Sequence, residues 1–301
     1  MPLHVYYDTR LAPTTFDFTV FLVGSDAYRQ SIGVTSSYIY IVAPEFRMTS
    51  KRDKTTEKDE KRWRVNHILA PLPSLIPSTL RVTVQMDVFN QISYPVYPPS
   101  YPPLSGQPAS IPYTPDILLK FYDAGFDIQP LRACEHGKLL VRNITLGHNY
   151  YTITLRTTRF QSERNSTLDH WYRVYKELTS LGLKVWVIPD IEDVFGDKRA
   201  FRYDWQIADF AIYDLRLRMA LYEDAEDNLF VSNGIGAILT FSKCPFKMFK
   251  VCNESFSSTD TEYFERYWQI KPGESPRFFG NHQTWNWVDD EPESILKTVV
   301  R

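Results

Sequence analysis

Residues 149–190 constrain the fold more than any other stretch, because they carry the pattern of a strand, a loop, an amphipathic helix and a second strand. Residues 150–155 are rich in Tyr, Thr and Ile, which favour a half-buried strand. Apolar residues then recur at three- and four-residue steps from Leu168 to Leu181, which predicts one face of a helix that Gly182 can end. An apolar run at residues 185–188 follows. The pattern predicts a right-handed βαβ unit with two parallel strands.

A second pattern of the same kind opens the chain. Residues 3–7 are strand-prone, residues 16–32 carry an apolar helical stripe that Gly33 can end, and residues 37–42 read as a second strand. A length of 301 residues suits two domains. We therefore expect an α/β protein of two Rossmann-like domains, residues 1–145 and 146–301.

The net charge, the apolar runs and the cysteine count of the chain exclude some classes of binding partner. The net charge of −2 argues against a general nucleic-acid binder. The N-terminus lacks a secretory pattern and no apolar run is long enough to span a bilayer, so we expect a cytoplasmic protein, with peripheral association to a membrane left open. The three cysteines lack the spacing of a metal site or a disulfide framework, and we expect reduced thiols and no metal.

The loop between the strand and the helix of residues 149–190 carries Arg156, Arg159 and Arg164, joined by Asn165 and Ser166. A loop that follows a parallel strand and opens a helix collects free amides and the positive end of the helix dipole. Guanidinium groups bind oxyanions bidentately, and open α/β sheets bind ligands at this edge. The pattern predicts a diphosphate site, the alternative being a solvated loop whose arginines pair with nearby acids.

Two more positions follow predicted strands. Asn233 and Gly234 lie in a turn before a helix, where a glycine lets phosphate approach the backbone closely, although a plain strand-to-helix turn is the equal alternative. Asp190 is placed to bond a ribose hydroxyl or to cap a helix. Arg216 and Arg218, in a later helix, could extend the anion surface, although arginines on a helix face are usually solvated.

To bind a nucleotide sugar, the protein would need an aromatic ring that stacks on the base and polar side chains that bind the sugar. Tyr222 could stack on a base or pack at the edge of the core, and Trp285 with Asp289 could line a sugar pocket or pack inside. For acid/base chemistry the N-terminal half offers Asp8, Asp17 and His136, among which the sequence does not choose. There is no D-x-D cluster, so we expect arginines rather than a metal to neutralise a diphosphate, and no cofactor.

Four segments carry simpler predictions. Residues 51–61 are a charge run expected to form a surface loop, and residues 94–115 hold eight prolines and should form a long extended loop. Residues 134–141 and 206–212 are expected to be strands. The role of the proline-rich segment is not indicated by its composition.

The stretches TLRTTRFQSERNSTLDHW, VWVIPDIED, LRLRMALYEDAEDNLFVSNGIGA and GNHQTWNWVDD, with FDFTVFLVGSDAYRQSIG near the start, resemble GT-B-type glycosyltransferases. More narrowly, they are similar to proteins associated with bacterial surface-polysaccharide synthesis. The resemblance implies two domains facing a cleft, with the donor held by the C-terminal half. In fucosyltransferase-like GT-B enzymes an arginine motif holds the donor pyrophosphate, a role that falls here on Arg156, Arg159 and Arg164, although Leu155 stands where that motif has a His.

The expected function is metal-independent transfer of a sugar from a nucleotide-diphosphate donor to a carbohydrate acceptor. The alternatives are a nucleotide-sugar epimerase and a non-catalytic carbohydrate-binding or assembly protein. The donor base and sugar, the acceptor, the stereochemical outcome and the oligomeric state are not determined by the sequence.

Overall fold

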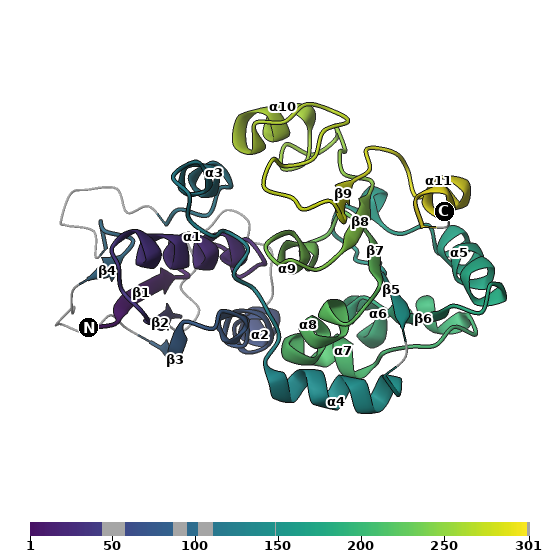
Figure 1. The fold of residues 1–301 in the computed structure, drawn as a ribbon, viewed down its shortest axis with the longest axis horizontal. Helices are drawn as coiled ribbons and strands as arrows, with labels where there is room; N and C mark the ends of the chain where they lie inside the picture. The colour runs from purple at the N-terminus through teal and green to yellow at the C-terminus, as the bar shows by residue number, and fades with distance from the viewer. Residues whose placement is uncertain (44–57, 87–94, 102–110, 148, 300–301) are drawn as a thin grey trace. The chain divides into compact units, whose positions relative to one another are not determined.

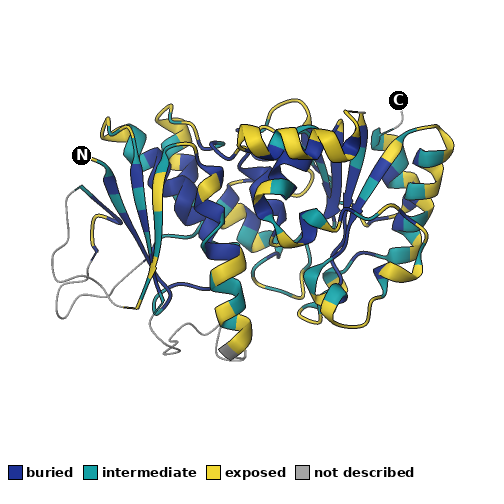
Figure 2. Cartoon of the chain, turned by 90° about the horizontal axis from the view of Figure 1, so that it is seen from below, coloured by how far each residue is buried: buried dark blue, intermediate teal, exposed yellow. Residues whose placement is uncertain are grey.

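The computed structural model describes residues 1–43, 58–86, 95–101, 111–147 and 149–299. The chain forms two compact units, Met1–Arg132 and Ala133–Arg301. Each unit has its own parallel sheet with helices packed against it, so the predicted α/β class is confirmed. In the burial view of Figure 2 most strands are largely buried, and the helices carry exposed residues on one side.

Unit 1 is built on a four-stranded sheet in the order β3-β2-β1-β4. Its strands are β1 (Leu3–Asp8), β2 (Ser37–Val42), β3 (Thr79–Gln85) and β4 (Val96–Tyr97), all paired in parallel. Helix α1 (Phe18–Ser31) joins β1 to β2 and ends before Gly33, whose φ of 68° is left-handed. The predicted opening strand–helix–strand pattern is therefore confirmed (Figure 1).

Alternate residues of β1 set the core of unit 1. Val5 and Tyr7 are fully buried, and the Tyr7 ring lies 4.3 Å from Phe18 and 5.0 Å from Phe21 on α1. Aromatic rings at these separations add to the apolar area that the helix buries against the strand. The apolar stripe of α1 thus faces the sheet, as its periodicity predicts.

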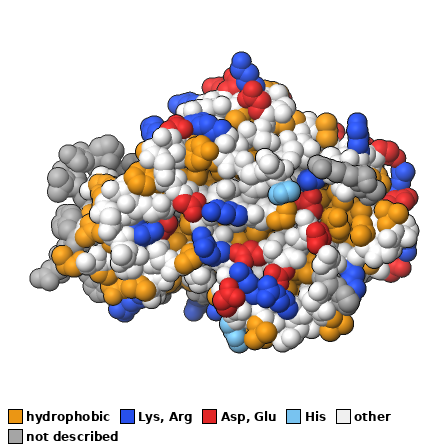
Figure 3. All heavy atoms as spheres, viewed as in Figure 1, with side chains coloured by type: hydrophobic (Ala, Val, Ile, Leu, Met, Phe, Trp, Pro, Cys, Tyr) orange, Lys and Arg blue, Asp and Glu red, His pale blue; other side chains and the backbone are white. Residues whose placement is uncertain are grey.

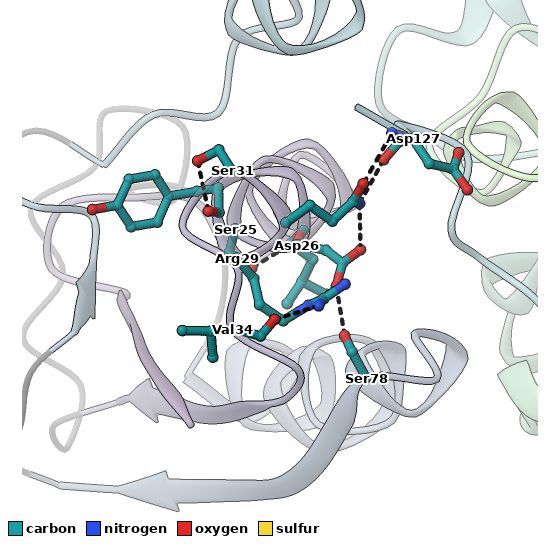
Figure 4. Close-up of polar contacts among 10 residues, drawn as sticks. Ser25, Asp26, Arg29, Ser31, Val34, Ser78 and Asp127 are labelled. Atoms are coloured by element: carbon teal, nitrogen blue, oxygen red, sulfur yellow. Dashed lines mark hydrogen bonds and ion pairs between the residues drawn. The ribbon is translucent and has the colours of Figure 1, made fainter. Parts of the chain in front are cut away.

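A buried carboxylate anchors α1 to two distant segments (Figure 4). Asp26 is 4% exposed and accepts hydrogen bonds from Arg29 Nε at 2.7 Å and from Ser78 Oγ at 2.5 Å. Gln30 donates to Asp26 at 3.0 Å and to the Asp127 carbonyl at 3.0 Å. Because buried charges are costly unless they are paired, this network fixes the helix against the residue that precedes β3 and against the end of unit 1.

The remaining segments of unit 1 modify two predictions. Residues 51–57 lie outside the described residues, but residues 58–61 are not a loop, because they open α2 (Lys58–Arg64), which continues into a π-helical turn, Val65–Leu69. Part of the proline-rich segment forms β4, an edge strand, where a residue without an N–H is tolerated. A short helix, α3 (Asp116–Asp123), follows this segment.

Unit 2 carries a five-stranded parallel sheet in the order β6-β5-β7-β8-β9. Its strands are β5 (Tyr150–Thr154), β6 (Lys184–Ile188), β7 (Asp227–Val231), β8 (Phe246–Phe249) and β9 (Gln283–Trp285). Helix α5 (Leu168–Ser180) links β5 to β6, and α11 (Pro292–Val299) contacts α5. Trp171, Val174 and Leu178 of α5 are fully buried in one apolar cluster with Ile153 of β5, which confirms the predicted βαβ unit.

Residues 134–141, expected to be a strand, belong instead to α4 (Glu135–Thr145), which packs on α8 (Leu215–Glu223). Cys134 caps the helix, since its Sγ accepts a hydrogen bond from the Gly137 N–H at 3.4 Å. A Cβ on Gly137 would lie 3.6 Å from the Cβ of Ala220, an ordinary van der Waals distance, so α4 and α8 are in direct contact here. Helix packing therefore overrides the local apolar run, and the boundary between units falls at Arg132 rather than after residue 145.

The connections of unit 2 hold short helices: α6 (Ile191–Phe195), α7 (Phe210–Tyr213), α9 (Gly236–Thr240) and α10 (Thr261–Tyr263). The predicted strand at residues 206–212 is wrong. Only Ile207 forms a bridge, to Val187, and α7 begins three residues later. Among the described residues, no helix is both long and apolar enough to cross a membrane.

Candidate functional site

The strand order of unit 2 places a topological switch point between β5 and β7. From β5 the chain crosses over to β6 on one side, whereas β7 pairs with β5 on the other side. In open α/β sheets ligands bind outside the carboxyl ends of the strands at such a point. The segments that leave this edge are the arginine loop (residues 155–167), the turn at residues 232–235 and the segment that starts at Asp190.

Arg156 is used inside the arginine loop. It is 6% exposed, and its guanidinium donates to the Gln161 carbonyl at 2.8 Å, to Asn165 Oδ1 at 2.5 Å and to the Phe160 carbonyl at 2.6 Å. Ser166 Oγ accepts from the Arg156 N–H at 2.9 Å. Burial lowers the pKa of Arg156, but a guanidinium stays charged in proteins. Arg156, Asn165 and Ser166 therefore stabilise the conformation of the loop. They were predicted to bind phosphate directly, and the structure corrects that prediction.

Arg159 lies at the surface. Its side chain is 83% exposed, with Nη2 3.9 Å from the Asp197 carboxylate, and its N–H donates to Glu192. This placement matches the alternative of a solvated arginine near an acid rather than the predicted diphosphate ligand.

Arg164 joins the two loops at the switch point. Its Nη1 donates to Gln161 Oε1 at 2.6 Å, and its Nη2 donates to Ser232 Oγ at 3.1 Å and to the Ser232 carbonyl at 3.3 Å. Asn233 Oδ1 accepts from the Gly236 N–H at 2.7 Å, and Gly234 is exposed. Arg164, Asn233 and Gly234 are thus the predicted phosphate residues that the structure brings to one place.

Asp290 occupies the N-terminus of α5, where a diphosphate was expected. The carboxylate is 1% exposed and accepts from the Thr167 N–H at 2.8 Å, Trp171 Nε1 at 2.7 Å and Lys250 Nζ at 2.7 Å. Burial raises the pKa of Asp290, but the hydrogen bonds from Lys250 and Thr167 outweigh it, so the pKa lies below its ordinary value. The predicted neighbour, Asp289, is exposed.

Asp190 serves as a helix cap at the same edge. Its Oδ1 accepts from the Glu192 N–H at 3.1 Å and its Oδ2 accepts from the Thr157 N–H at 3.4 Å. Burial raises the pKa of Asp190, and these backbone hydrogen bonds oppose the shift. The Thr157 hydroxyl next to it is buried and has no hydrogen-bond partner among the described residues.

The two aromatic candidates are core residues. Tyr222 is fully buried, with its hydroxyl 2.8 Å from Thr154 Oγ1, and Trp285 is 4% exposed, enclosed by the rings of Phe264, Trp268 and Phe279. Neither ring has a face open to a base or a sugar, so packing was the correct alternative for both.

The three acid/base candidates differ in setting. Asp8 is 1% exposed and accepts from Arg10 Nη2 at 2.5 Å and from the Tyr101 hydroxyl at 3.0 Å. Asp17 precedes α1 and accepts from Thr15 Oγ1 at 2.9 Å. His136 is exposed on α4, which belongs to unit 2, so its assignment to the N-terminal domain is wrong.

The rest of the described surface bears on where else a ligand or a metal ion could bind. A depression lined by Gly147, Asn149, Gly182, Leu183 and Lys184 lies at the amino ends of β5 and β6, at the opposite edge of the sheet. On the face seen in Figure 3, basic side chains lie beside acidic ones. The described residues contain no group of three or more His, Cys, Asp or Glu side chains that could hold a metal ion.

No protein-family model matches the chain, and neither does any curated protein. Solved structures do match. E. coli heptosyltransferase WaaC with ADP has a TM-score of 0.56 at 10% identity, with 99% of both chains covered. The chain has the GT-B fold.

Two further structures agree with this GT-B assignment. WaaC with ADP-2-deoxy-2-fluoro heptose gives a TM-score of 0.52 at 9% identity over 99% of both chains. A glycosyl transferase of family 9 from Veillonella parvula DSM 2008 gives 0.50 at 10% identity, covering 99% of this chain and 88% of that one. The resemblance to GT-B glycosyltransferases is confirmed, and at these identities the likeness speaks for the fold.

Proposed function

We propose that this GT-B protein transfers a sugar from a nucleotide-diphosphate donor to a carbohydrate hydroxyl, without a metal ion or other cofactor. The fold supports the proposal, since WaaC, which shares it, is a heptosyltransferase whose structures hold ADP and an ADP-heptose analogue. The decisive support is local and comes from unit 2 of this chain.

The observation that carries the proposal is the position of Arg164. Its guanidinium bonds Ser232 across the switch point, so a cation lies between the carboxyl ends of β5 and β7, beside the exposed Gly234. A guanidinium has five N–H donors, and phosphate oxygens are its best-matched acceptors. A diphosphate at this edge would share Arg164 with Ser232.

The chemistry follows from that placement. Negative charge develops on the diphosphate as the sugar leaves, and fixed donors that are already in place stabilise it. Asp190 would accept a hydrogen bond from a ribose hydroxyl. An acid/base group takes the proton from the acceptor hydroxyl, and Asp8, Asp17 and His136 stay the candidates. The proposal places the reaction in the cytoplasm, where Cys134, Cys244 and Cys252 would remain free thiols.

Titration calorimetry with ADP, GDP, UDP and CDP tests the proposal. We expect one of them to bind one-to-one in buffer containing EDTA, and Arg164→Gln to weaken that binding about tenfold or more. Arg159→Gln is the matched control in the same loop, since its side chain is 83% exposed, and it should bind like the wild type.

The alternatives give other outcomes. Consumption of a nucleotide sugar without any acceptor would identify an epimerase. Binding of oligosaccharide with no binding of any nucleoside diphosphate would identify a carbohydrate-binding or assembly protein and overturn the proposal.

A further inference from the structure

Arg218 on α8 is buried without an acceptor. The residue is 7% exposed, and its Nε is enclosed with no hydrogen-bond partner. No hydrogen bond or ion pair of its side chain is found among the described residues. Arg216, two positions earlier, behaves in the opposite way: its side chain is 57% exposed and is paired with Asp214 at 2.8 Å.

Arg218 lies in the first half of α8, and its charge acts on Asp190. One helical turn further on, the Tyr222 hydroxyl contacts Thr154, the last residue of β5, so Arg218 is directed toward the end of that strand. Burial raises the pKa values of Tyr222 and Asp190, and the positive charge of Arg218 opposes both shifts, which places the guanidinium within electrostatic reach of both groups. Yet Asp190 forms its hydrogen bonds with Glu192 and Thr157.

A second buried polar group without a partner, the Thr157 hydroxyl, belongs to a residue that contacts Asp190. The Thr157 hydroxyl is enclosed and has no hydrogen-bond partner in the described chain, while the Thr157 N–H bonds Asp190. Buried polar groups are normally satisfied, and an arginine cannot lose its charge to lower the cost of burial. Two orphaned donors around one carboxylate indicate that a ligand supplies the missing acceptor.

We infer that Arg218 binds an anionic oxygen of the ligand of unit 2, while Asp190 accepts a hydrogen bond from a hydroxyl of the same ligand. This inference rests on the proposed function and adds a second cation to the donor site, separate from Arg164. The anionic oxygen belongs either to the diphosphate or to a carboxylate on the transferred sugar. The helix face that carries Arg218 is therefore a ligand-binding face rather than a solvated one.

The test compares Arg218→Gln with Arg216→Gln in the full chain. Calorimetry with nucleoside diphosphates should show dissociation constants raised about tenfold or more in Arg218→Gln and unchanged in Arg216→Gln. Arg218→Lys keeps the charge but loses the planar fork, and it should lie between the two. If the loss appears with UDP-glucuronate but not with UDP, the anionic oxygen is a sugar carboxylate.

Thermal melting without ligand separates a binding role from a structural one. Removal of a buried charge that has no partner should raise the melting temperature of Arg218→Gln by roughly 2–4 °C, whereas loss of a structural contact would lower it. Equal nucleotide affinity in Arg218→Gln and wild type would overturn the inference and leave the proposed function intact.

If no nucleotide binds the wild type, thermal melting with inorganic diphosphate still tests the anion site. Stabilisation of wild type but not of Arg218→Gln by diphosphate would then support the anion site while the proposed function fails. Equal stabilisation of both proteins, or of neither, would overturn the inference. Far-UV circular dichroism confirms that each variant is folded.

Discussion

Three arginines within nine residues of sequence have three different environments. Arg156 is enclosed and donates to carbonyls of its own loop, Arg159 is in solvent, and Arg164 joins two loops at the switch point. The side-chain type alone therefore does not determine the role. What separates the three residues is the number of acceptors that the folded loop offers to each guanidinium.

Arg156→Gln should destabilise unit 2 by about 2 kcal/mol, because it leaves carbonyl groups of the loop without a donor. Arg159→Gln should change the free energy of unfolding by less than about 0.5 kcal/mol, since its side chain is 83% exposed. Urea unfolding of the two variants measures both values, and equal effects would contradict the structural role of Arg156.

Asp290→Asn should destabilise the protein by about 3 kcal/mol at pH 7, because Lys250 would lose its buried partner. The folded pKa of Asp290 is lowered, so its stabilising contribution is present above the unfolded pKa and is lost as pH falls through the folded value. The difference between variant and wild type should therefore shrink in acid unfolding below about pH 4. Asp289→Asn, at an exposed position, is the control and should be nearly neutral.

At the scale of elements, the turn from β7 into α9 depends on a glycine for space. A Cβ on Gly236 would lie 2.5 Å from the Phe230 ring, which is fully buried and cannot move away freely. Gly236→Ala should cost about 1–3 kcal/mol and lower the melting temperature. Gly280→Ala has nothing within 4 Å of the new methyl group and should melt like the wild type. A neutral Gly236→Ala would show that the turn is packed differently.

Elements with a long apolar period were predictable, whereas elements defined by a partner far along the chain were not. The stripe of Trp171, Val174 and Leu178 predicts α5 because a helix repeats every few residues, whatever lies opposite. Residues 134–141 were misassigned because their helical state depends on contact with α8, some 80 residues later.

For the candidate site, the sequence predicted only the sheet edge at which it would lie. A loop that follows a parallel strand marks the edge of the sheet, and the structure places Arg164, Asn233 and Asp190 there. The sequence did not predict that Asp290 caps the N-terminus of α5, because residues about 120 positions apart meet only in the folded chain. The sequence did not predict the burial of Arg218 either, because the same helix carries Arg216, which is solvated.

For the molecule as a whole, the GT-B fold is established by structures that share only 9–10% of its sequence over 99% of its length. Such a match arises because packing of strands and helices tolerates almost any apolar residue of suitable size. Chemistry requires particular polar groups in particular places, so the proposed function depends on the polar groups at one sheet edge of unit 2 rather than on the fold.

The central claim is that a diphosphate binds at the carboxyl edge of β5 and β7, and a crystal structure soaked with ADP, GDP or UDP tests it most directly. The account predicts phosphate oxygens within hydrogen-bond distance of Arg164, with Arg218 donating to an anionic oxygen of the donor when the nucleotide sugar is bound. Nucleotide bound instead at the amino-edge depression formed by Gly147, Asn149 and Lys184 would contradict it.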